Sequence, residues 1–538
     1  MHEISEYRPN VLLIGSDDGL SLFDTKTGSH HLFTSSEIDP SSLSDKFIYP
    51  IFKDREGGVW IGTYFGGVNY ISPNSGLFEH YTHSHYVNSV NGNVIGGFTE
   101  DKKGNIWIAS DDGGLNCMDI RTGHFTTYMP QPGKNSLSYH NVHALCWDDD
   151  NLWIGTYAGG LNVLNTKTGK FKRYNSSDRN PKTLDGGSVY SIFKDRNNRM
   201  WVASMSGVNL YNRTTDDFTR IKSFNSTTIG ITQDNKGWIW FVTQGKGAYR
   251  LNPQTNQWRN YSCIPKDKSS IPSNQLNCIL FDSKARLWMG TTNGLCRYDY
   301  TKDRFVTVNL NIPSNNICSI VEDNNDLWIT TSKGLIRYNT LNNNCQGFTR
   351  SDGLVSDQFL VNSGFKSSTG KIYIGTANGF NVFHPKNIIS NKNIPTVAIT
   401  DIEILNKSVD LTPDGPLTRS LSFIDHIDLS YKQNVFTVGF VALSYTTPEK
   451  NKYAFKLEGF DKDWIYVNKQ HKATYTNLPA GKYIFRVKAS NSDGLLERRR
   501  NIHRDCDSSL YLVEYRIQIS ISAADNTSDT IYFAGVPT

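Results

Sequence analysis

The chain has 538 residues, of which 38% are hydrophobic and 12% aromatic, and its formal net charge is +5. It is too long for one hydrophobic core and contains enough apolar residues to bury several, so disorder is not the default expectation. The 56 basic and 51 acidic residues are spread along the chain. This balance argues against nucleic acid or an anionic membrane as the partner.

Targeting and membrane signals are not found in the sequence. The first ten residues lack the apolar run of a secretory signal. No run approaches the roughly 18 to 20 apolar residues that a membrane-spanning helix needs. The sequence is therefore expected to contain no targeting signal and no membrane-spanning segment.

A short motif recurs along most of the chain and organises it. The clearest copies are residues 59–69, 106–116 and 152–162, each with a tryptophan in a short apolar run followed by paired glycines. Taking one central position per copy, the recurrence runs through Leu13, Trp60, Trp107, Trp153, Trp201, Trp240, Trp288, Trp328 and Tyr373, with spacings of 47, 47, 46, 48, 39, 48, 40 and 45 residues. Nine units of this length indicate a propeller or a solenoid.

Each unit reads as four short strands. In the third unit we expect strands near residues 93–100, 106–110, 115–119 and 124–128, separated by Gly, Asp and Asn turns. Four-stranded units favour a β-propeller, which typically closes with four to eight blades. The sequence therefore predicts an all-β chain in which residues 89–387 form a seven-bladed β-propeller. Residues 1–88 are predicted to be two extra blade repeats of a preceding, incomplete propeller.

Two recurring residue types have structural explanations. An aspartate precedes most tryptophan strands, and it is expected to cap a tight turn through its own side chain. These aspartates are Asp54, Asp101, Asp195, Asp234, Asp282 and Asp323. The recurring tryptophan is expected to pack between blades, because one four-stranded sheet cannot bury both of its faces alone.

The period stops after residue 385, and a different domain follows. Residues 388–394 are read as a linker. Alternating strands are expected near residues 397–405, 434–442, 452–457, 471–477 and 482–489. About 100 residues of short strands with frequent turns predict an immunoglobulin-like β-sandwich over residues 395–494.

At this point the residues resemble a known family. The repeats resemble the two-component regulator propeller repeat, and residues 436–494 resemble the tyrosine-rich Y_Y_Y domain. The residues that match this domain are Phe440, Tyr445, Tyr453, Leu457, Gly459, Trp464, Tyr475, Asn477 to Gly481, Tyr483, Phe485, Val487, Ala489 and Asn491 to Gly494. The resemblance implies the periplasmic sensor region of a hybrid two-component system of the Bacteroidetes type, which recognises oligosaccharides.

The chain departs from this family at both ends. Only two repeats stand for the first propeller, and the stretch after Gly494 shows no membrane helix, kinase histidine motif or phosphoacceptor domain. Kinase activity is therefore not carried over, and the chain is read as a fragment. Residues 495–538 are read as a frameshifted, non-native tail. One permitted back-translation of residues 494–516, read one base later, encodes a turn, a strand and flanking tryptophans that resemble the family. The sandwich would then lack its final strand.

Enzymatic motifs are not found. The sequence contains no nucleophile elbow, phosphate loop or zinc-ligand helix, so no catalytic, cofactor-binding or metal site is predicted. His80, His83 and His85 are assigned to a solvated loop, and the carboxylate pair Asp111 and Asp112 to a turn.

Sugar recognition has three candidate residues. Tyr64, Phe65 and Tyr157 follow tryptophan strands, and aromatic rings stack on the apolar faces of sugars. The alternative for these rings is packing at a blade edge.

The resulting functional hypothesis is a non-catalytic extracytoplasmic region that senses an oligosaccharide and relays the signal through the Y_Y_Y domain. A homodimer through that domain is the expected assembly, and periplasmic placement is implied by resemblance. The alternatives are a carbohydrate-active propeller enzyme, such as a lyase or glycosidase, and a general protein-interaction propeller. Oligosaccharide calorimetry with product analysis separates the three.

Overall fold

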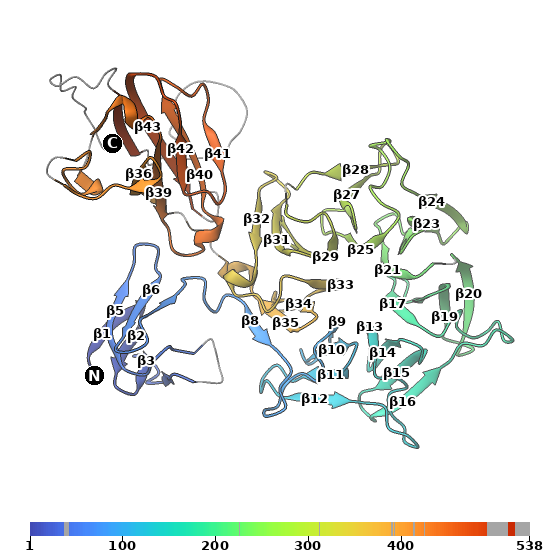
Figure 1. Ribbon diagram of the computed structural model, residues 1–538. Helices are drawn as coiled ribbons and strands as arrows, with labels where there is room; N and C mark the ends of the chain where they lie inside the picture. The colour runs from blue at the N-terminus through green and yellow to red at the C-terminus, as the bar shows by residue number, and fades with distance from the viewer. Residues whose placement is uncertain are drawn as a thin grey trace. The chain divides into compact units, whose positions relative to one another are not determined.

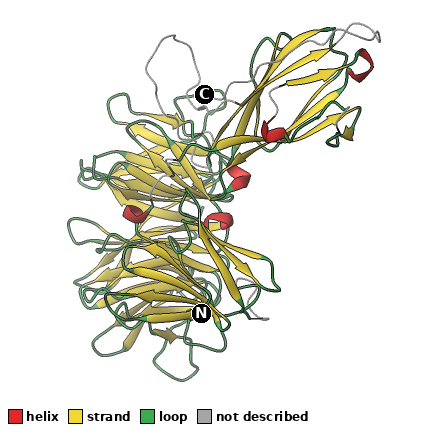
Figure 2. Ribbon diagram, turned by 90° about the vertical axis from the view of Figure 1, so that its left-hand side faces the viewer, coloured by secondary structure: helices red, strands yellow, loops and turns green. Residues whose placement is uncertain are grey.

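The computed structural model describes residues 1–36, 42–224, 226–310, 312–388, 391, 393–412, 415–423, 426–491 and 515–521. The chain divides into two compact units. One is Gly76–Ile388, and the other combines Met1–Ser75 with Ile389–Thr538. Figure 2 shows that strands dominate both units. The helical elements in the described residues are short 3-10 turns: η1 (Arg350–Asp352), η2 (Pro385–Asn387), η3 (Leu421–Phe423), η4 (Tyr431–Gln433) and η5 (Pro448–Lys450).

The unit Gly76–Ile388 is a seven-bladed β-propeller, with seven four-stranded antiparallel sheets in its described residues (Figure 1). The first three blades consist of β9 (Ile95–Glu100), β10 (Ile106–Ser110), β11 (Gly114–Met118) and β12 (Phe125–Tyr128); β13 (Val142–Asp148), β14 (Asn151–Thr156), β15 (Leu161–Asn165) and β16 (Lys170–Tyr174); and β17 (Val189–Lys194), β18 (Met200–Ser204), β19 (Gly207–Asn212) and β20 (Asp217–Ser223).

The next three blades follow the same order. They consist of β21 (Thr228–Gln233), β22 (Ile239–Thr243), β23 (Ala248–Asn252) and β24 (Gln257–Tyr261); β25 (Leu276–Phe281), β26 (Leu287–Thr291), β27 (Gly294–Asp299) and β28 (Arg304–Val308); and β29 (Ile317–Asp323), β30 (Asp326–Thr331), β31 (Gly334–Asn339) and β32 (Cys345–Phe348). The prediction of an all-β chain with propeller repeats is confirmed.

The seventh blade closes the ring with strands from both ends of the unit. It contains β33 (Phe359–Lys366), β34 (Ile372–Thr376), β35 (Gly379–Phe383) and, as its fourth strand, β8 (Glu79–Tyr81). Tyr81 pairs with Phe380 across the two strands, and their rings stack at 4.8 Å. The predicted boundary between residues 88 and 89 therefore lies on the wrong side of β8. A strand of three residues carries too little periodicity to be assigned to a distant partner from sequence.

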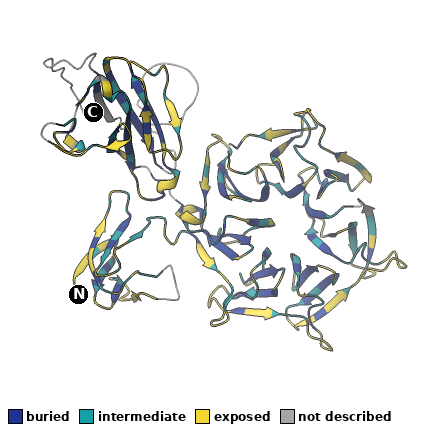
Figure 3. Cartoon of the chain, viewed as in Figure 1, coloured by how far each residue is buried: buried dark blue, intermediate teal, exposed yellow. Residues whose placement is uncertain are grey.

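The recurring tryptophans pack between blades, as predicted. Trp107 belongs to one buried cluster with Leu152 and Ile154 of the following blade. Trp153 lies in turn in a cluster with Met200 and Val202 of the blade after that. Figure 3 shows that burial decreases from the inner strands of the blades to the outer strands. Each blade thus uses its neighbour to cover the face that it cannot cover itself.

The spacing of six residues that recurs between aspartate and tryptophan also brings the two side chains into a hydrogen bond, which the sequence did not predict. In five turns, one carboxylate oxygen of the aspartate accepts two backbone N–H groups, and the other accepts the indole N–H of the tryptophan six residues later. The five pairs are Asp54 with Trp60, Asp101 with Trp107, Asp195 with Trp201, Asp234 with Trp240 and Asp282 with Trp288, at 2.8 to 3.3 Å between Oδ2 and Nε1. The capping prediction is confirmed at these five positions.

Two turns are one residue shorter, and their aspartates behave differently. Asp148 and Asp323 precede their tryptophans by five residues instead of six. Asp148 forms ion pairs with Lys194 and Arg213, and Asp323 forms one with Lys366. The capping prediction is therefore wrong for Asp323, because the tighter turn places this carboxylate at the end of β29.

The N-terminal part of the other unit contains two sheets. The first has the order β1 (Glu3–Arg8), β2 (Val11–Ser16), β3 (Gly19–Asp24) and β4 (His30–Phe33), and the second has the order β5 (Ile48–Lys53), β6 (Val59–Thr63) and β7 (Val68–Ile71). Leu13 and Leu20 of the first sheet form one buried cluster with Ile48, Val59 and Ile61 of the second. These are the two additional blade repeats, the second with three strands in the described residues.

The C-terminal part of the same unit is a β-sandwich with two sheets. One sheet has the order β37 (Lys407–Ser408), β36 (Thr396–Ile404), β39 (Phe436–Leu443) and β42 (Lys472–Tyr475). The other has the order β38 (His426–Leu429), β44 (Tyr515–Ile521), β43 (Gly481–Ser490), β40 (Lys452–Glu458) and β41 (Ile465–Val467). Their inner faces form one core that contains Phe440, Tyr453 and Phe485.

The sandwich has a strand where the sequence predicted a missing one. β44 pairs antiparallel with β43 and parallel with β38, and Ile519 is 1% exposed in the common core. The expectation that the sandwich lacks its last strand is therefore wrong for the described residues, while the frameshift origin of residues 495–538 stays a prediction. Residues 495–514 and 522–538 lie outside the described residues.

Candidate functional site

The inner strands of the propeller carry a repeated irregularity at one end of each blade. In six blades, one residue near the start of the first strand has no counterpart on the second strand, which defines a β-bulge. The bulge residues are Gly96, His143, Tyr190, Ile229, Asn277 and Cys318. A bulge bends its strand and reorients a side chain, and bulges are enriched beside functional sites. His143 and Tyr190 are the two large polar side chains of this set.

The loops that follow the second strands reach the same end of the blades. Tyr157 follows β14 directly, and its backbone N–H donates to the carbonyl of Asn141 at 3.0 Å. Gly160, whose φ is +70°, reverses the chain here, where a Cβ would lie 2.3 Å from the carbonyl oxygen of Tyr174. Tyr157 is thereby held in a defined place although it is 46% exposed.

Aromatic rings and polar groups meet around His143. Its ring centroid lies 4.7 Å from that of Tyr190 and 6.0 Å from that of Tyr157. Its Nδ1 lies 3.6 Å from Oδ1 of Asp111, which directly follows β10 in the preceding blade. We call Asp111, Tyr139, His143, Tyr157 and Tyr190 the His143 cluster. It joins residues from three consecutive blades.

Burial determines the charge state of the cluster. It lowers the pKa of His143 to about 4, and together with the neighbouring Asp112 it raises the pKa of Asp111 to about 6. At neutral pH the imidazole is therefore uncharged and Asp111 is mainly ionised. The contact between them is then a carboxylate beside a neutral ring and not an ion pair.

Three buried polar atoms of this region have no hydrogen-bond partner among the described residues. They are Oδ1 of Asp111, Nε2 of His143 and Oδ1 of Asn141. Buried polar atoms are nearly always paired in folded proteins, so an unpaired group needs an explanation. Two carbonyl or carboxylate acceptors and an imidazole nitrogen therefore lie unpaired in the region of these tyrosine rings.

The adjacent carboxylate has a structural role. Burial raises the pKa of Asp112, but hydrogen bonds from the backbone N–H groups of Asn93 and Val94 lower it overall. Asp112 thus caps a turn, as expected for this pair. Asp111 is the member that faces the cluster, and sequence alone did not separate the two roles.

Two of the three predicted ligand residues lie in the other unit. Tyr64 is 64% exposed and Phe65 is 78% exposed, and their ring centroids are 4.5 Å apart. The ring of Tyr64 lies 5.6 Å from that of Tyr49, and the ring of Phe65 lies 6.3 Å from that of Phe47. We call these four residues the β6 aromatic patch. The alternative of packing at a blade edge is represented by the contacts among these rings, and a ligand role stays a prediction.

The sequence contained a signal for Asp111 but only a weak one for His143. Four residues after the central tryptophan the repeats carry Tyr64, Asp111 and Tyr157, followed in later repeats by Met205 and Gln244. This position varies while its neighbours recur, which is typical of a binding position on a repeated scaffold. His143 and Tyr190 sit in bulges, and the register that creates a bulge is visible only in the folded sheets.

Among the described residues, no group of three or more His, Cys, Asp or Glu side chains is placed to hold a metal ion. Within the same residues, no helix has the length and apolar character to cross a bilayer.

Family models match both parts of the chain. The two component regulator propeller model matches residues 42–65, 89–112, 136–158 and 183–206, and the Y_Y_Y domain model matches residues 444–500. Histidine kinase P4 of Formosa agariphila is 26% identical over an alignment of 333 residues, and the match covers 52% of this chain. The chain spans 24% of the length of that kinase.

Solved structures match nearly the whole chain. The extracellular domain assigned to a hybrid two component system, BT3049 of B. thetaiotaomicron, is 25% identical with a TM-score of 0.78, and the match covers 97% of this chain and 67% of that one. The extracellular domain of BT4673 from the same organism is 23% identical with a TM-score of 0.50, covers 96% and 68%, and shows the fold alone. This chain therefore combines two component regulator propeller repeats with a Y_Y_Y domain and is similar to the extracellular sensor region of a two-component system.

Proposed function

We propose that the chain is a non-catalytic, extracytoplasmic region that binds an oligosaccharide at the His143 cluster and relays binding through the sandwich to a kinase. The observation that carries this proposal is that Oδ1 of Asp111 and Nε2 of His143 are both buried and unpaired on side chains that lie 3.6 Å apart at Oδ1 and Nδ1. One sugar hydroxyl donates a hydrogen bond to Oδ1 of Asp111, and another pairs with Nε2 of His143. Tyr157 and Tyr190 offer ring faces on which a sugar stacks.

The β6 aromatic patch is proposed as a second contact surface for sugar. Its rings are exposed and already arranged by mutual contacts. The backbone N–H of Phe65 donates to Oδ2 of Asp45 at 2.9 Å, which fixes the turn that carries the ring. Preorganised aromatic rings bind at a lower entropic cost than flexible ones.

Placement and assembly are part of the same proposal. The relatives of known structure are extracellular domains, which supports a periplasmic location for this chain. A homodimer through the Y_Y_Y domain is the proposed signalling assembly. Sedimentation of the chain with and without a bound oligosaccharide tests it, because a sensor that signals by dimerisation shifts toward the dimer with ligand.

Calorimetry against a panel of oligosaccharides, with product analysis of the same samples, tests the function. We expect heat from one glycan class and no cleavage products. Tyr157→Ala should weaken this binding about tenfold, which corresponds to losing about 1.4 kcal/mol of ring contact. His143→Ala should weaken it by a similar factor.

A matched control is Tyr466→Ala, which removes a tyrosine that is 61% exposed on the sandwich and should leave binding unchanged. Cleavage of a glycan would replace the sensor by a carbohydrate-active enzyme. Binding that survives both Tyr157→Ala and His143→Ala would contradict the assigned site while leaving a sensor possible elsewhere.

A further inference from the structure

The sandwich ends on one side with a strand that has a neighbour on only one of its edges. β41 pairs antiparallel with β40 and is the last strand of the five-stranded sheet. Figure 1 shows it at the margin of the sandwich. Its other edge faces no further strand among the described residues, so its backbone N–H and C=O groups are open there. An open edge of this kind is a template for pairing with another strand.

The other three edges of the described sandwich carry charged side chains, which oppose such pairing. Lys407 lies in β37, Asp428 in β38 and Lys472 in β42, and all three are exposed. β41 consists instead of isoleucine, tyrosine and valine, which favour strands. Ile465 is 41% exposed and Tyr466 is 61% exposed. Within the described sandwich, β41 is therefore the edge strand without a charge to guard it.

The aromatic side chains at this edge are held by a buried lysine. Lys488 of β43 is 8% exposed, and its Nζ lies 3.9 Å from the ring centroid of Trp464 and 5.7 Å from that of Tyr466. A desolvated ammonium group is attracted to the face of an aromatic ring. Both rings are thereby ordered before any partner binds, which lowers the entropic cost of a contact.

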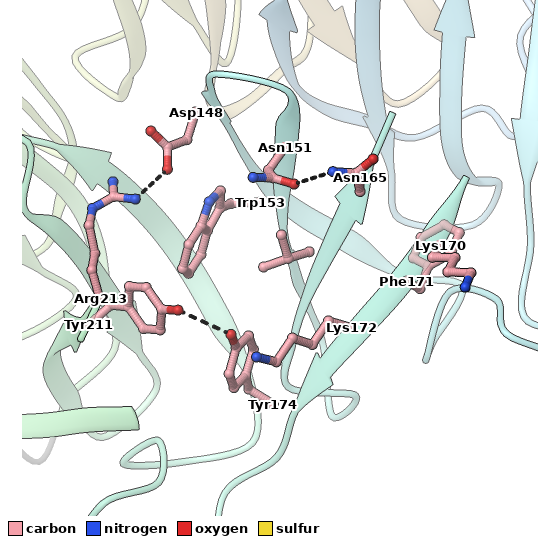
Figure 4. A pocket seen from close by; sticks show the side chains of 11 residues that line it. Asp148, Asn151, Trp153, Asn165, Lys170, Phe171, Lys172, Tyr174, Tyr211 and Arg213 are labelled. Atoms are coloured by element: carbon pink, nitrogen blue, oxygen red, sulfur yellow. Dashed lines mark hydrogen bonds and ion pairs between the residues drawn. The ribbon is translucent and has the colours of Figure 1, made fainter. Parts of the chain in front are cut away.

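Tyrosines at the surface of the propeller are, by contrast, held within the chain. Tyr174 and Tyr211 line a hollow of about 370 Å³ between the blade of β13 to β16 and the blade of β17 to β20 (Figure 4). Both rings are partly buried, and both hydroxyls donate to Asp216, at 2.6 and 2.7 Å. More than half of Tyr466 is exposed, so its ring remains available for contact with another molecule.

The sequence around Tyr466 is complementary to itself in the antiparallel direction. When two copies of β41 are placed side by side about a two-fold axis at Tyr466, Ile465 of each copy faces Val467 of the other. Three residues from the axis on either side, Asp463 faces Lys469. Both of these are exposed, and no ion pair joins either to another of the described residues. The charges thus favour a second copy of the same strand as the partner.

We propose that two copies of the chain pair antiparallel through β41. The pairing rests on the proposed function, because it supplies the homodimer of the Y_Y_Y domain with a surface. A contact made by one strand lies at the lower end of interface sizes, so the dimer is reversible and forms as the concentration rises. Tyr466 is not part of the His143 cluster or of the β6 aromatic patch. Its replacement therefore changes the assembly and leaves the sugar sites unchanged.

Sedimentation of the full chain over a range of concentrations tests the pairing. We expect a reversible dimer for the wild type. Tyr466→Lys places two like charges opposite each other and should weaken the dimer at least tenfold. Asp463→Lys and Lys469→Asp should each do the same, because each variant faces itself with two like-charge pairs. Mixing these two variants should restore a dimer as the heterodimer, in which opposite charges meet on both sides of the axis.

Lys407→Asp is the matched control, because it reverses an exposed charge on another edge of the sandwich and should leave the dimer unchanged. Recovery on mixing shows that the single variants are folded. A dimer that persists in Tyr466→Lys and in both charge variants would overturn pairing through β41 and leave a homodimer through another surface. Single variants that do not recombine would overturn the two-fold arrangement. A wild type that stays monomeric would overturn the homodimer itself, while sugar binding is measured separately by calorimetry.

Discussion

The carboxylate of Asp282 accepts the indole N–H of Trp288, with 2.8 Å between Oδ2 and Nε1. The same side chain accepts the backbone N–H groups of Lys284 and Arg286 through its other oxygen, at 3.0 and 2.8 Å. One buried aspartate thus fixes a turn, the strand that follows it and the ring that packs against the next blade. The repeat is held together by this triple contact as well as by apolar burial.

Asp282→Ala should lower the free energy of unfolding of the propeller by about 3 kcal/mol, because it leaves two backbone donors, one indole donor and the guanidinium of Arg286 without their acceptor. Urea titration followed by tryptophan fluorescence measures the loss. Asp323→Ala is the control. This aspartate forms an ion pair with Lys366, and within the described residues it accepts no hydrogen bond from its tryptophan. It should lose at most about 1 kcal/mol. Equal losses would show that the Trp contact adds nothing.

Protonation of His143 should destabilise the propeller in acid. Burial lowers its pKa from 6.5 to about 4, so its contribution to stability is complete above pH 6.5 and is lost as the pH falls to about 4. Asp111 has the opposite effect on stability. Its pKa is raised from 3.8 to about 6, so its contribution to the free energy of unfolding is complete below pH 3.8 and is lost as the pH rises to about 6. Asp111→Asn should therefore lose stability between pH 6.5 and 4 more steeply than the double variant Asp111→Asn with His143→Gln. Identical pH profiles would contradict this assignment.

Ionisation of Asp111 should control ligand affinity at the His143 cluster. The carboxylate accepts sugar hydroxyls best when ionised, and its pKa is raised to about 6. Affinity for the recognised oligosaccharide is expected to fall as the pH decreases from 7 to 5. In Asp111→Asn the affinity should be lower at pH 7 and nearly constant over that range. Calorimetry at several pH values makes the comparison, and an unchanged pH dependence in the variant would exclude Asp111 as the acceptor.

The closing strand β8 should be indispensable for the ring. A chain of residues 76–388 contains all seven blades and is expected to unfold in a cooperative transition. A chain of residues 89–388 lacks β8 and exposes the edge of β35, so we expect aggregation. Circular dichroism and size-exclusion chromatography of the two chains distinguish these outcomes. Equal behaviour would mean that the β8 ladder contributes little to closure.

Phe65→Ser tests the β6 aromatic patch. The side chain is 78% exposed, so its loss should change the melting temperature by less than about 1 °C. If the patch stacks on sugar, the same change should weaken oligosaccharide binding by about threefold or more. Thr82→Ser is a conservative loop control that should change neither quantity. Unaltered affinity in Phe65→Ser would remove the patch from the binding surface.

The repeat pattern was sufficient for the blades but not for their connections. The Trp strands, the Asp turns and the sandwich strands were predictable because apolar alternation and turn residues are local properties. The pairing of Tyr81 with Phe380 depends on contacts between residues about 300 positions apart. The match of β44 to β43 is of the same kind, since a strand becomes part of a sheet only through its partner.

The candidate site was predictable only in part. Tyr157 was predicted because it is an aromatic residue in the turn after a tryptophan strand, and its ring lies 6.0 Å from that of His143. His143 was missed, because a bulge changes the direction of a side chain without changing the apolar pattern around it.

The closing blade has a consequence for how such chains can diversify. Phe78, just before β8, and Ile388, at the end of the propeller, lie in the same buried cluster. The ring is thus an insertion whose entry and exit are adjacent, joined to the flanking chain at Ser75 and Ile389. A module joined in this way can be replaced as a whole. Its replacement changes neither the order of the flanking segments nor the distance between the two points at which the module joins them. Replacing the ring would then leave the sequences of the flanking sheets and of the sandwich unchanged.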